Sequence, residues 1–374
     1  GIIMITMKSG IEGKTRISYN TYTGFKEARK SDAYGYTTKE WAEQQMEENG
    51  ELSIYTQAQL QTGTDRSWQD VFFDGGAITS HSLSFRGGNK STKYTASLNY
   101  SNDEGVLLND NYSKYGARLK VDNKINDKFS IGVNFTPSYT VRDRFAESIH
   151  NVARHQPWLP IYHDEYTLQM VDPSFGLQVG DYARQDHFTI FDFNGDGVFD
   201  EELQNLGNST NQNPYARASE RSRMDKKFKL FGSVNGKYKI TDGLNFTTTI
   251  SGSIQDTKRT DYLGTLARRI STEAYMVETN QKEQYYIFDN FLNYNKVFGK
   301  HEIGVTLGNS IETRDYFFST IKGIGFENDV VQQISGATSI IADETFGFEW
   351  QKRGISYISR LTYAYDDKYL MSLS

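Results

Sequence analysis

The stretch that decides the fold is residues 114–140, which read KYGARLKVDNKINDKFSIGVNFTPSYT. Two sets of apolar residues in it alternate with polar ones, namely Tyr115, Ala117, Leu119 and Val121, then Phe129, Ile131, Val133 and Phe135. Between the two sets lies Ile125-Asn126-Asp127, which has the residues of a tight turn. A period of two places one set of side chains on each face of a strand. The stretch therefore predicts two antiparallel strands joined by a hairpin turn.

The same alternation recurs along most of the chain. We expect strands at about 15–25, 81–87, 92–101, 114–124, 128–139, 226–240, 244–256, 284–298, 301–312 and 354–365, with an eleventh beginning near 369. A tilted strand needs about 9–11 residues to cross a bilayer, and several of these stretches are long enough. Their second face carries residues such as Arg118, Lys120 and Asn134, so it is polar enough to face water.

The connections between these strands alternate in length. Short turns lie at 88–91, 125–127, 241–243, 299–300 and 366–368, and longer excursions lie at about 26–80, 102–113, 140–225, 257–283 and 313–353. Short turns on one side and long loops on the other are typical of outer-membrane barrels. The sequence thus predicts an all-β fold, an antiparallel transmembrane β-barrel. The alternative is a soluble β-protein, whose strands would each be half-buried.

Composition agrees with this class and narrows the functions. Only 37% of the 374 residues are apolar, yet 14% are aromatic, as expected for strands that bury alternate residues. The net charge of −6 argues against a partner such as duplex nucleic acid. The absence of Cys excludes disulfides, thiolate metal sites and Cys nucleophiles.

The chain opens with Gly-Ile-Ile-Met-Ile-Thr-Met-Lys-Ser-Gly (1–10). This stretch resembles the end of the plug domain in the SusC-like (SusC/RagA) family of TonB-dependent outer-membrane transporters, with Met7 in place of the usual second Thr. The other similar stretches follow in the family's order: 14–20, Trp68-Gln69-Asp70, 81–88, 93–100, 102–105, Asn213-Pro214 and 365–370.

The resemblance implies a barrel of roughly 22 strands with a plug folded inside it. Residues 1–13 would then be the C-terminal end of the plug, and residues 14–374 the N-terminal half of the barrel, about 10–11 strands. The loops at about 26–80, 140–225, 257–283 and 313–353 would be extracellular. It also implies a SusD-like surface lipoprotein as partner, a TonB complex acting through a region before Gly1, and a dimer of such SusCD pairs.

Residues 192–203 resemble a calcium loop. Oxygen ligands at the usual spacing would come from Asp192, Asn194, Asp196, the Val198 carbonyl, Asp200 and Glu202, and Gly197 stands at the sharp turn. Position twelve is Leu203, so the usual bidentate Glu is missing and Glu201 or Glu202 would have to replace it. We expect a structural Ca²⁺ that stiffens an extracellular loop. The alternative is an acidic, Asx-rich turn without an ion.

Aromatic residues of the same excursion are candidates for contact with a substrate. Trp158, Tyr162, Tyr166 and Tyr215 could stack on sugar rings or contact peptides. The alternative is packing within a large loop. No catalytic residues are assigned, because the six His show no tight metal spacing and no P-loop, nucleophile elbow or zinc-protease motif occurs.

These observations predict a protein that is not an enzyme and needs no cofactor. The leading hypothesis is TonB-dependent import of oligosaccharides across the bacterial outer membrane. Import of oligopeptides by the same architecture, and a non-transporting adhesin or binding protein, are the alternatives.

Overall fold

A computed structural model gives the fold of the chain. It describes residues 10–30, 37–153, 155–204, 206, 213–269, 272–366 and 368–374. Most of the expected plug segment, residues 1–9, lies outside the described residues. No helix in the described part of the chain is long and apolar enough to cross a membrane.

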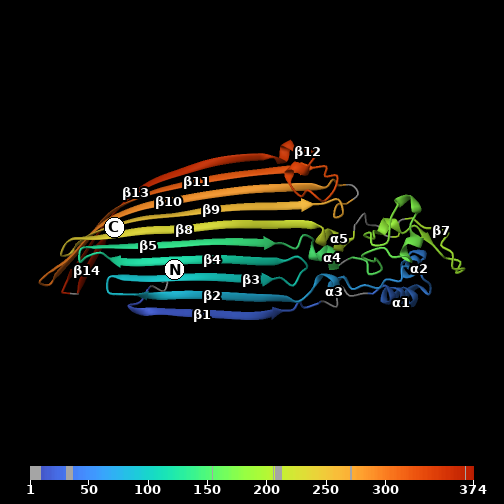
Figure 1. Cartoon of the computed structure of the whole chain (residues 1–374), viewed down its shortest axis with the longest axis horizontal. Helices are drawn as coiled ribbons and strands as arrows, with labels where there is room; N and C mark the ends of the chain where they lie inside the picture. The colour runs from blue at the N-terminus through green and yellow to red at the C-terminus, as the bar shows by residue number, and fades with distance from the viewer. Residues whose placement is uncertain are drawn as a thin grey trace.

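The main body is one antiparallel sheet that is twisted and curved (Figure 1). Its strands are β1 (Gly13–Lys26), β2 (Gly76–Gly88), β3 (Thr92–Glu104), β4 (Asn111–Lys124), β5 (Phe129–Asp143), β8 (Arg221–Thr241), β9 (Leu244–Leu263), β10 (Tyr275–Phe298), β11 (His301–Ile324), β13 (Phe346–Tyr365) and β14 (Tyr369–Leu373). Each pairs with the next of these strands, and the short β12 (Ser339–Ile340) pairs with β11. The expected all-β antiparallel architecture is confirmed.

The connections are sorted by length between the two ends of the sheet (Figure 1). At one end the strands are joined by tight turns, such as Thr241-Asp242-Gly243, in which Gly243 has a φ of 87° that suits glycine. At the other end lie the connections from β1 to β2 and from β5 to β8, together with those from β9 to β10 and from β11 to β13. We call this the loop end.

The later strands are longer than the sequence pattern predicts. β9 runs to Leu263 and β10 begins at Tyr275, so the loop expected at 257–283 shrinks to 264–274. Likewise, β11 and β13 leave 325–345 instead of 313–353. In the extensions of β9, β10 and β11, polar residues occupy both faces, which hides the alternation, while backbone pairing such as Lys282↔Phe317 continues unbroken. At about 3.4 Å per residue, the 24-residue β10 spans about 80 Å, far more than a ~30 Å hydrocarbon core.

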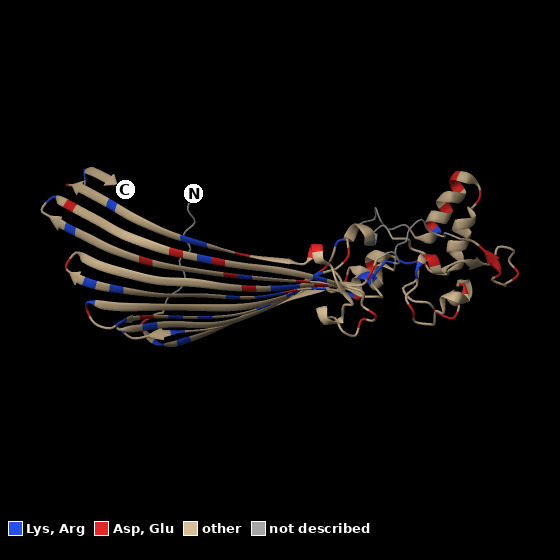
Figure 2. Cartoon of the chain, turned by 90° about the horizontal axis from the view of Figure 1, so that it is seen from above, with Lys and Arg blue, Asp and Glu red and all other residues tan. Residues whose placement is uncertain are grey.

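The described parts of the long connections 27–75 and 144–220 fold together into one body at the loop end (Figures 1 and 2), which we call the loop domain. It contains α1 (Thr38–Asn49), α2 (Ile54–Gln61), α3 (Trp68–Phe72), α4 (Ile149–Ala153), α5 (Pro214–Ser219) and the small hairpin of β6 (Ile190–Phe191) and β7 (Glu201–Glu202). Side-chain caps start several helices. At α1, for example, Thr37 Oγ1 accepts from the Glu40 backbone N–H at 3.1 Å, and the Thr37 backbone N–H donates to the Glu40 carboxylate at 2.9 Å.

The loop domain has a core of the kind found in soluble proteins. Its centre is formed by Phe72, Trp158, Leu159, Met170, Ala183, Phe188 and Phe191, each at most 1% exposed. Asn213 ties the segments together, because its Nδ2 donates to the carbonyls of Ile161 (2.7 Å) and Ala183 (3.0 Å) while its Oδ1 caps α5. The loops are therefore an ordered structure packed from distant parts of the sequence.

Candidate functional site

The register of the sheet sorts its side chains into an apolar face and a polar face. Paired residues point to the same side of a sheet, so the pairs Leu83↔Leu98 and Val133↔Val234 belong to one face. On that face large apolar side chains are open, including Ile250 at 58% and Leu98 at 57% exposed. An open apolar face of this size is what lipid covers in a membrane barrel.

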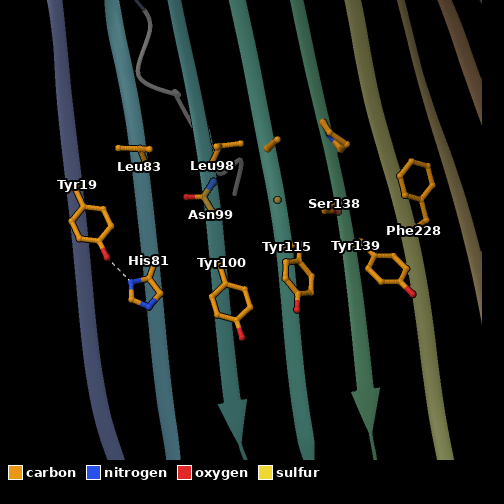
Figure 3. Close-up of a pocket in the computed structure, with 13 residues that line it drawn as sticks. Tyr19, His81, Leu83, Leu98, Asn99, Tyr100, Tyr115, Ser138, Tyr139 and Phe228 are labelled. Carbon is orange, nitrogen blue, oxygen red and sulfur yellow. Dashed lines mark hydrogen bonds between the residues drawn. The ribbon is translucent and has the colours of Figure 1, made fainter.

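A row of aromatic rings crosses the apolar face near the loop end of the first strands (Figure 3). It consists of Tyr19, His81, Tyr100, Tyr115, Tyr139 and Phe228, one from each of β1, β2, β3, β4, β5 and β8. Tyr100 and Tyr115 have ring centroids 5.1 Å apart, and Tyr19 Oη lies 2.7 Å from His81 Nδ1. Rings in such a girdle mark the level of the membrane surface. We therefore interpret the row as a contact with lipid headgroups, not as a substrate site.

The same register row changes character on the later strands. Phe228 of β8 is paired with Asp256 of β9, which is paired with Lys282 of β10. The row then continues to Phe317 of β11 and Glu349 of β13. Because barrel strands are tilted, equal register does not mean equal height, and these charged positions fit a level beyond the lipid. The charged residues of the strands gather near the turns and again toward the loop end (Figure 2).

The polar face carries two structural features near the loop end that no sequence motif predicts. One is a hollow of about 410 Å³ over β4, β5, β8, β9 and β10, lined largely by basic, hydroxyl and amide side chains. The other is a ladder of stacked rings on β11 and β13, in which Tyr316 and Trp350 are 5.4 Å apart and Phe318 and Phe348 are 5.2 Å apart. The alternation Phe346, Phe348, Trp350 could have indicated this ladder, but it lies in a stretch expected to be loop.

The four predicted substrate-contacting aromatics have different surroundings. Trp158 is 1% exposed and packs edge-on against Phe188, so it presents no face to a substrate, and its prediction as a binding residue is corrected. Its indole Nε1 is satisfied by Gln156 Oε1 at 3.0 Å. Burial in the core stabilises Trp158 because its large ring is apolar and its one polar group, the indole N–H, has a hydrogen-bond partner there.

The three tyrosines lie closer to the surface. Tyr162 is 45% exposed, stacks on Tyr182 at 5.0 Å and meets Tyr215 edge-on at 6.3 Å. Tyr166 is equally exposed, and its Oη donates to the Gln61 carbonyl at 2.9 Å while its ring meets Phe199 edge-on at 5.8 Å. The structure thus brings Tyr162 and Tyr215 into ring contact, whereas Tyr166 packs on Phe199. A role in substrate contact stays a prediction for these residues.

The expected calcium loop is a tight turn held by hydrogen bonds to its own backbone. The Asp192 carboxylate accepts from the amides of Gly195 (2.6 Å) and Gly197 (2.8 Å), and Asp196 Oδ1 accepts from Val198 N at 2.8 Å. Glu201 folds back to accept from Asn194 N at 3.0 Å. Glu202, the ligand that we expected, pairs with Ile190 in the small hairpin, where neighbouring side chains point to opposite sides.

No group of three or more His, Asp or Glu side chains within the described ranges is arranged to hold a metal ion. Calcium binding by this turn stays a prediction.

Two histidines that are 24 residues apart in sequence meet in the loop domain. His163 Nε2 lies 2.9 Å from His187 Nδ1, and the two side chains are 1% and 4% exposed. Burial lowers the pKa of each imidazole to about 4, and for His187 the nearby Arg184 guanidinium contributes to that lowering. Both rings are therefore neutral at pH 7. Nothing in the sequence spacing indicates this pair.

The chain matches TonB-dependent receptors over its whole length. A TonB-dependent receptor of Formosa agariphila is 23% identical over 386 residues, covering 100% of this chain and 34% of that protein. A second receptor of that organism is 23% identical over 389 residues, covering 100% and 33%. SusC of Bacteroides thetaiotaomicron is 27% identical over 179 residues, covering 44% of this chain and 16% of SusC. The resemblance to SusC-like TonB-dependent transporters is confirmed.

Solved structures give the same fold. The RagAB peptide transporter aligns with a TM-score of 0.68 at 17% identity, covering 96% of this chain and 41% of that one. A closed state of the RagAB peptide importer aligns equally well over 98% of this chain. No protein-family model matches the chain.

This SusC-like chain spans about a third of the length of the curated relatives that it matches. TonB-dependent receptors of this type are outer-membrane β-barrel proteins, so the expected location in the outer membrane is confirmed. The relatives are receptors and transporters, which agrees with the expectation that the chain is not an enzyme.

Proposed function

We propose that this chain is the barrel-wall and loop part of an importer that carries oligosaccharides across the outer membrane. The observation that carries the proposal is the match of the whole chain to TonB-dependent receptors. It is supported by a sheet whose apolar face is open to lipid. In this proposal the polar face lines the path of the oligosaccharide through the barrel, and the loop domain lies at the entrance of that path.

Sugar as cargo is supported by the inner face near the loop end. The ladder there offers ring surfaces, with Phe348 48% and Trp350 39% exposed. The Arg314 guanidinium lies 5.6 Å from the Trp350 ring centroid and is held by Glu283 at 2.6 Å. Aromatic rings that are flanked by hydrogen-bonding groups suit sugar rings, which have apolar faces and polar edges.

Import requires partners, which we propose by likeness to the relatives. A SusD-like lipoprotein would cover the loop end and capture the substrate there. A TonB complex would pull on a plug, and rearrangement of the plug would release the substrate inward. A dimer of two such pairs fits the same scheme. None of these steps involves covalent chemistry.

Oligopeptide import is the second candidate. The favouring observation is the structural match to the RagAB peptide transporter, although at 17% identity this likeness concerns the fold. Peptides and oligosaccharides place different demands on the loop end, since peptides need apolar pockets for their side chains.

The test is uptake by cells of the source organism. Cells that lack the gene and cells that carry it on a plasmid would be given fluorescent oligosaccharides or fluorescent peptides of similar length. We expect the gene to restore uptake of oligosaccharides only, and dissipation of the proton gradient to abolish it. Restored uptake of peptides alone would establish the second candidate, and no restored uptake of either would refute the importer.

A further inference from the structure

The hollow on the polar face, which we call the basic pocket, is built by the register of five strands. One row runs Lys114↔Thr140↔Lys227↔Thr257↔Gln281 across β4, β5, β8, β9 and β10. The next row toward the loop end includes Arg142, Asp225 and Arg259, and the row on the other side includes Lys229. Residues in paired rows of one parity share a face, so the sheet itself gathers these side chains.

The basic pocket has a surplus of positive charge. Its basic residues are Lys114, Arg142, Arg144, Lys227, Lys229 and Arg259, and its one acidic residue is Asp225. Asp225 pairs with Arg144 and lies 3.9 Å from Arg259 Nε. The other four cations make no ion pair with any residue that the structure describes. This surplus is local, because the chain as a whole carries a net charge of −6.

Unpaired cations gathered on one wall repel each other, and an anion that enters between them removes this cost. A groove that is lined by one sign of charge also raises the local concentration of ligands of the opposite sign. The volume of about 410 Å³ lies within the range of ordinary small-molecule sites, about 300–1,000 Å³. These features describe a binding site for an anionic ligand.

The remaining lining selects the class of anion. It consists of hydroxyl and amide side chains, namely Tyr112, Ser138, Thr140, Gln255, Thr257 and Gln281, with no aliphatic residue. Hydroxyl and amide groups exchange hydrogen bonds with the many hydroxyls of a sugar. An acidic peptide would also present apolar side chains, and this wall has no apolar pocket to receive them.

We propose that the basic pocket binds the carboxylate or sulfate groups of an anionic oligosaccharide on its way through the barrel. The proposal rests on the proposed import of oligosaccharides and narrows it to charged sugars. Lys114, Arg142, Lys227 and Lys229 bind the acidic groups, and the neighbouring hydroxyl and amide side chains bind the sugar hydroxyls.

The test uses the full-length transporter, purified in detergent together with its partner. The probes are tetragalacturonic acid and, as a neutral match, cellotetraose, with binding measured by calorimetry at two salt concentrations. The triple variant Arg142→Gln, Lys227→Gln, Lys229→Gln should weaken binding of the charged probe about tenfold and remove most of its salt dependence. The ratio of the two affinities should fall accordingly.

Lys226→Gln is the matched control, because Lys226 is adjacent in β8 and points to the opposite face. It should leave the affinity for both probes unchanged. A sulfated tetrasaccharide would show which acidic group the pocket prefers. Equal affinity of the triple variant and the wild type for the charged probe would overturn the proposal, and so would tighter binding of tetraglutamate than of tetragalacturonic acid.

The two proposals fail in different ways. If cells that carry the gene take up no oligosaccharide while the purified protein still binds tetragalacturonic acid through these residues, import is refuted. If cells take up cellotetraose but the purified protein binds no charged probe, the basic pocket is refuted and import stands.

Discussion

The sheet and the loop domain are stabilised in different ways, although one chain builds both. In the loop domain, Phe72 is fully buried and Trp158 is 1% exposed, as in a protein dissolved in water. On the sheet, Ile250 and Leu98 are more than half exposed. The hydrophobic effect therefore holds the loop domain together from within, whereas the sheet depends on its hydrogen-bond ladder and on lipid around it.

The comparison teaches that substitutions of similar size should have different consequences in the two regions. When a buried side chain of the loop domain is truncated, the packing contacts with its neighbours are lost and solvent does not replace them. When an outward side chain of the sheet is truncated, only contacts with lipid are lost. The predictions below test this contrast, from the largest expected effect to the smallest.

Truncating the core should unfold the loop domain and leave the barrel intact. Phe72→Ala should cost the loop domain about 3–5 kcal/mol, because it leaves a cavity where an aromatic ring packs on Phe145 and Tyr215. Limited proteolysis should then cut within 144–220 while the heat-modifiable gel mobility of the barrel persists. Tyr166→Ala, at a half-exposed position, is the control and should stay resistant. If the Phe72→Ala variant unfolded the barrel together with the loop domain, the two regions would not be stabilised independently.

Charge on the lipid face should destabilise the barrel and leave the loop domain folded. Ile250→Arg should cost about 2–4 kcal/mol, since the cation would enter the hydrocarbon. Its neighbour Thr249 is the matched control, because it points to the polar face and pairs with Asp289. Thr249→Arg should cost less than about 1 kcal/mol. The measurement is urea unfolding in lipid vesicles, and equal losses for the two variants would contradict the assignment of faces.

Acid should loosen the loop domain before it affects the sheet. Burial lowers the pKa of His155, His163 and His187 to about 4, below the ordinary value of about 6.5. Between these values the unfolded form binds more protons, so the stability of the loop domain is full above about pH 6.5 and falls as pH decreases toward 4.

We expect a loss of about 1–3 kcal/mol for each histidine over that range, seen as faster proteolysis of the loop domain at pH 5 than at pH 7. His163→Gln should flatten the profile, and His301→Gln, on the sheet, should not. A profile that is flat in the wild type would show that these histidines titrate normally.

Calcium should have the smallest effect. The turn at 192–201 is already closed by backbone hydrogen bonds and lacks the bidentate Glu, so we expect weak binding, in the range of about 10⁻⁴–10⁻³ M. Millimolar Ca²⁺ should stabilise the loop domain by about 1 kcal/mol or less, measured as a rise in its melting temperature. Asp196→Ala should abolish the rise, and an absent rise in the wild type would identify the turn as ion-free.

The first half of the sheet could be predicted closely from the sequence, and the second half could not. The strand expected at 114–124 is observed at 111–124, because apolar and polar residues alternate throughout it. The strand expected at 301–312 extends to Ile324. The sequence pattern misses this extension because the last part of the strand carries Arg314, Asp315 and two adjacent Phe residues and shows no clean alternation. Pattern reasoning detects a strand only where its two faces meet different solvents.

The loop domain and the candidate binding surfaces were beyond the reach of pattern reasoning. Trp158 is a candidate for substrate contact in the sequence because it shares a long excursion with other aromatic residues, yet it is buried in a core with Phe188 and Leu159. The basic pocket places Lys114 and Lys227 in one row of the sheet with Thr140 between them, although the two lysines are more than a hundred residues apart in sequence. Only the pairing of β4 with β5 and of β5 with β8 gathers them in that row.

The sequence by itself determined the antiparallel sheet, the order of its strands and the end at which the long connections lie. It could do so because alternation and turn residues are local properties, set by the backbone period and by the solvent on each face. The tertiary structure decided the length of the outer strands, the core of the loop domain, the His163–His187 contact and the basic pocket. Each of these depends on register or packing between distant segments, and no local pattern carries that information.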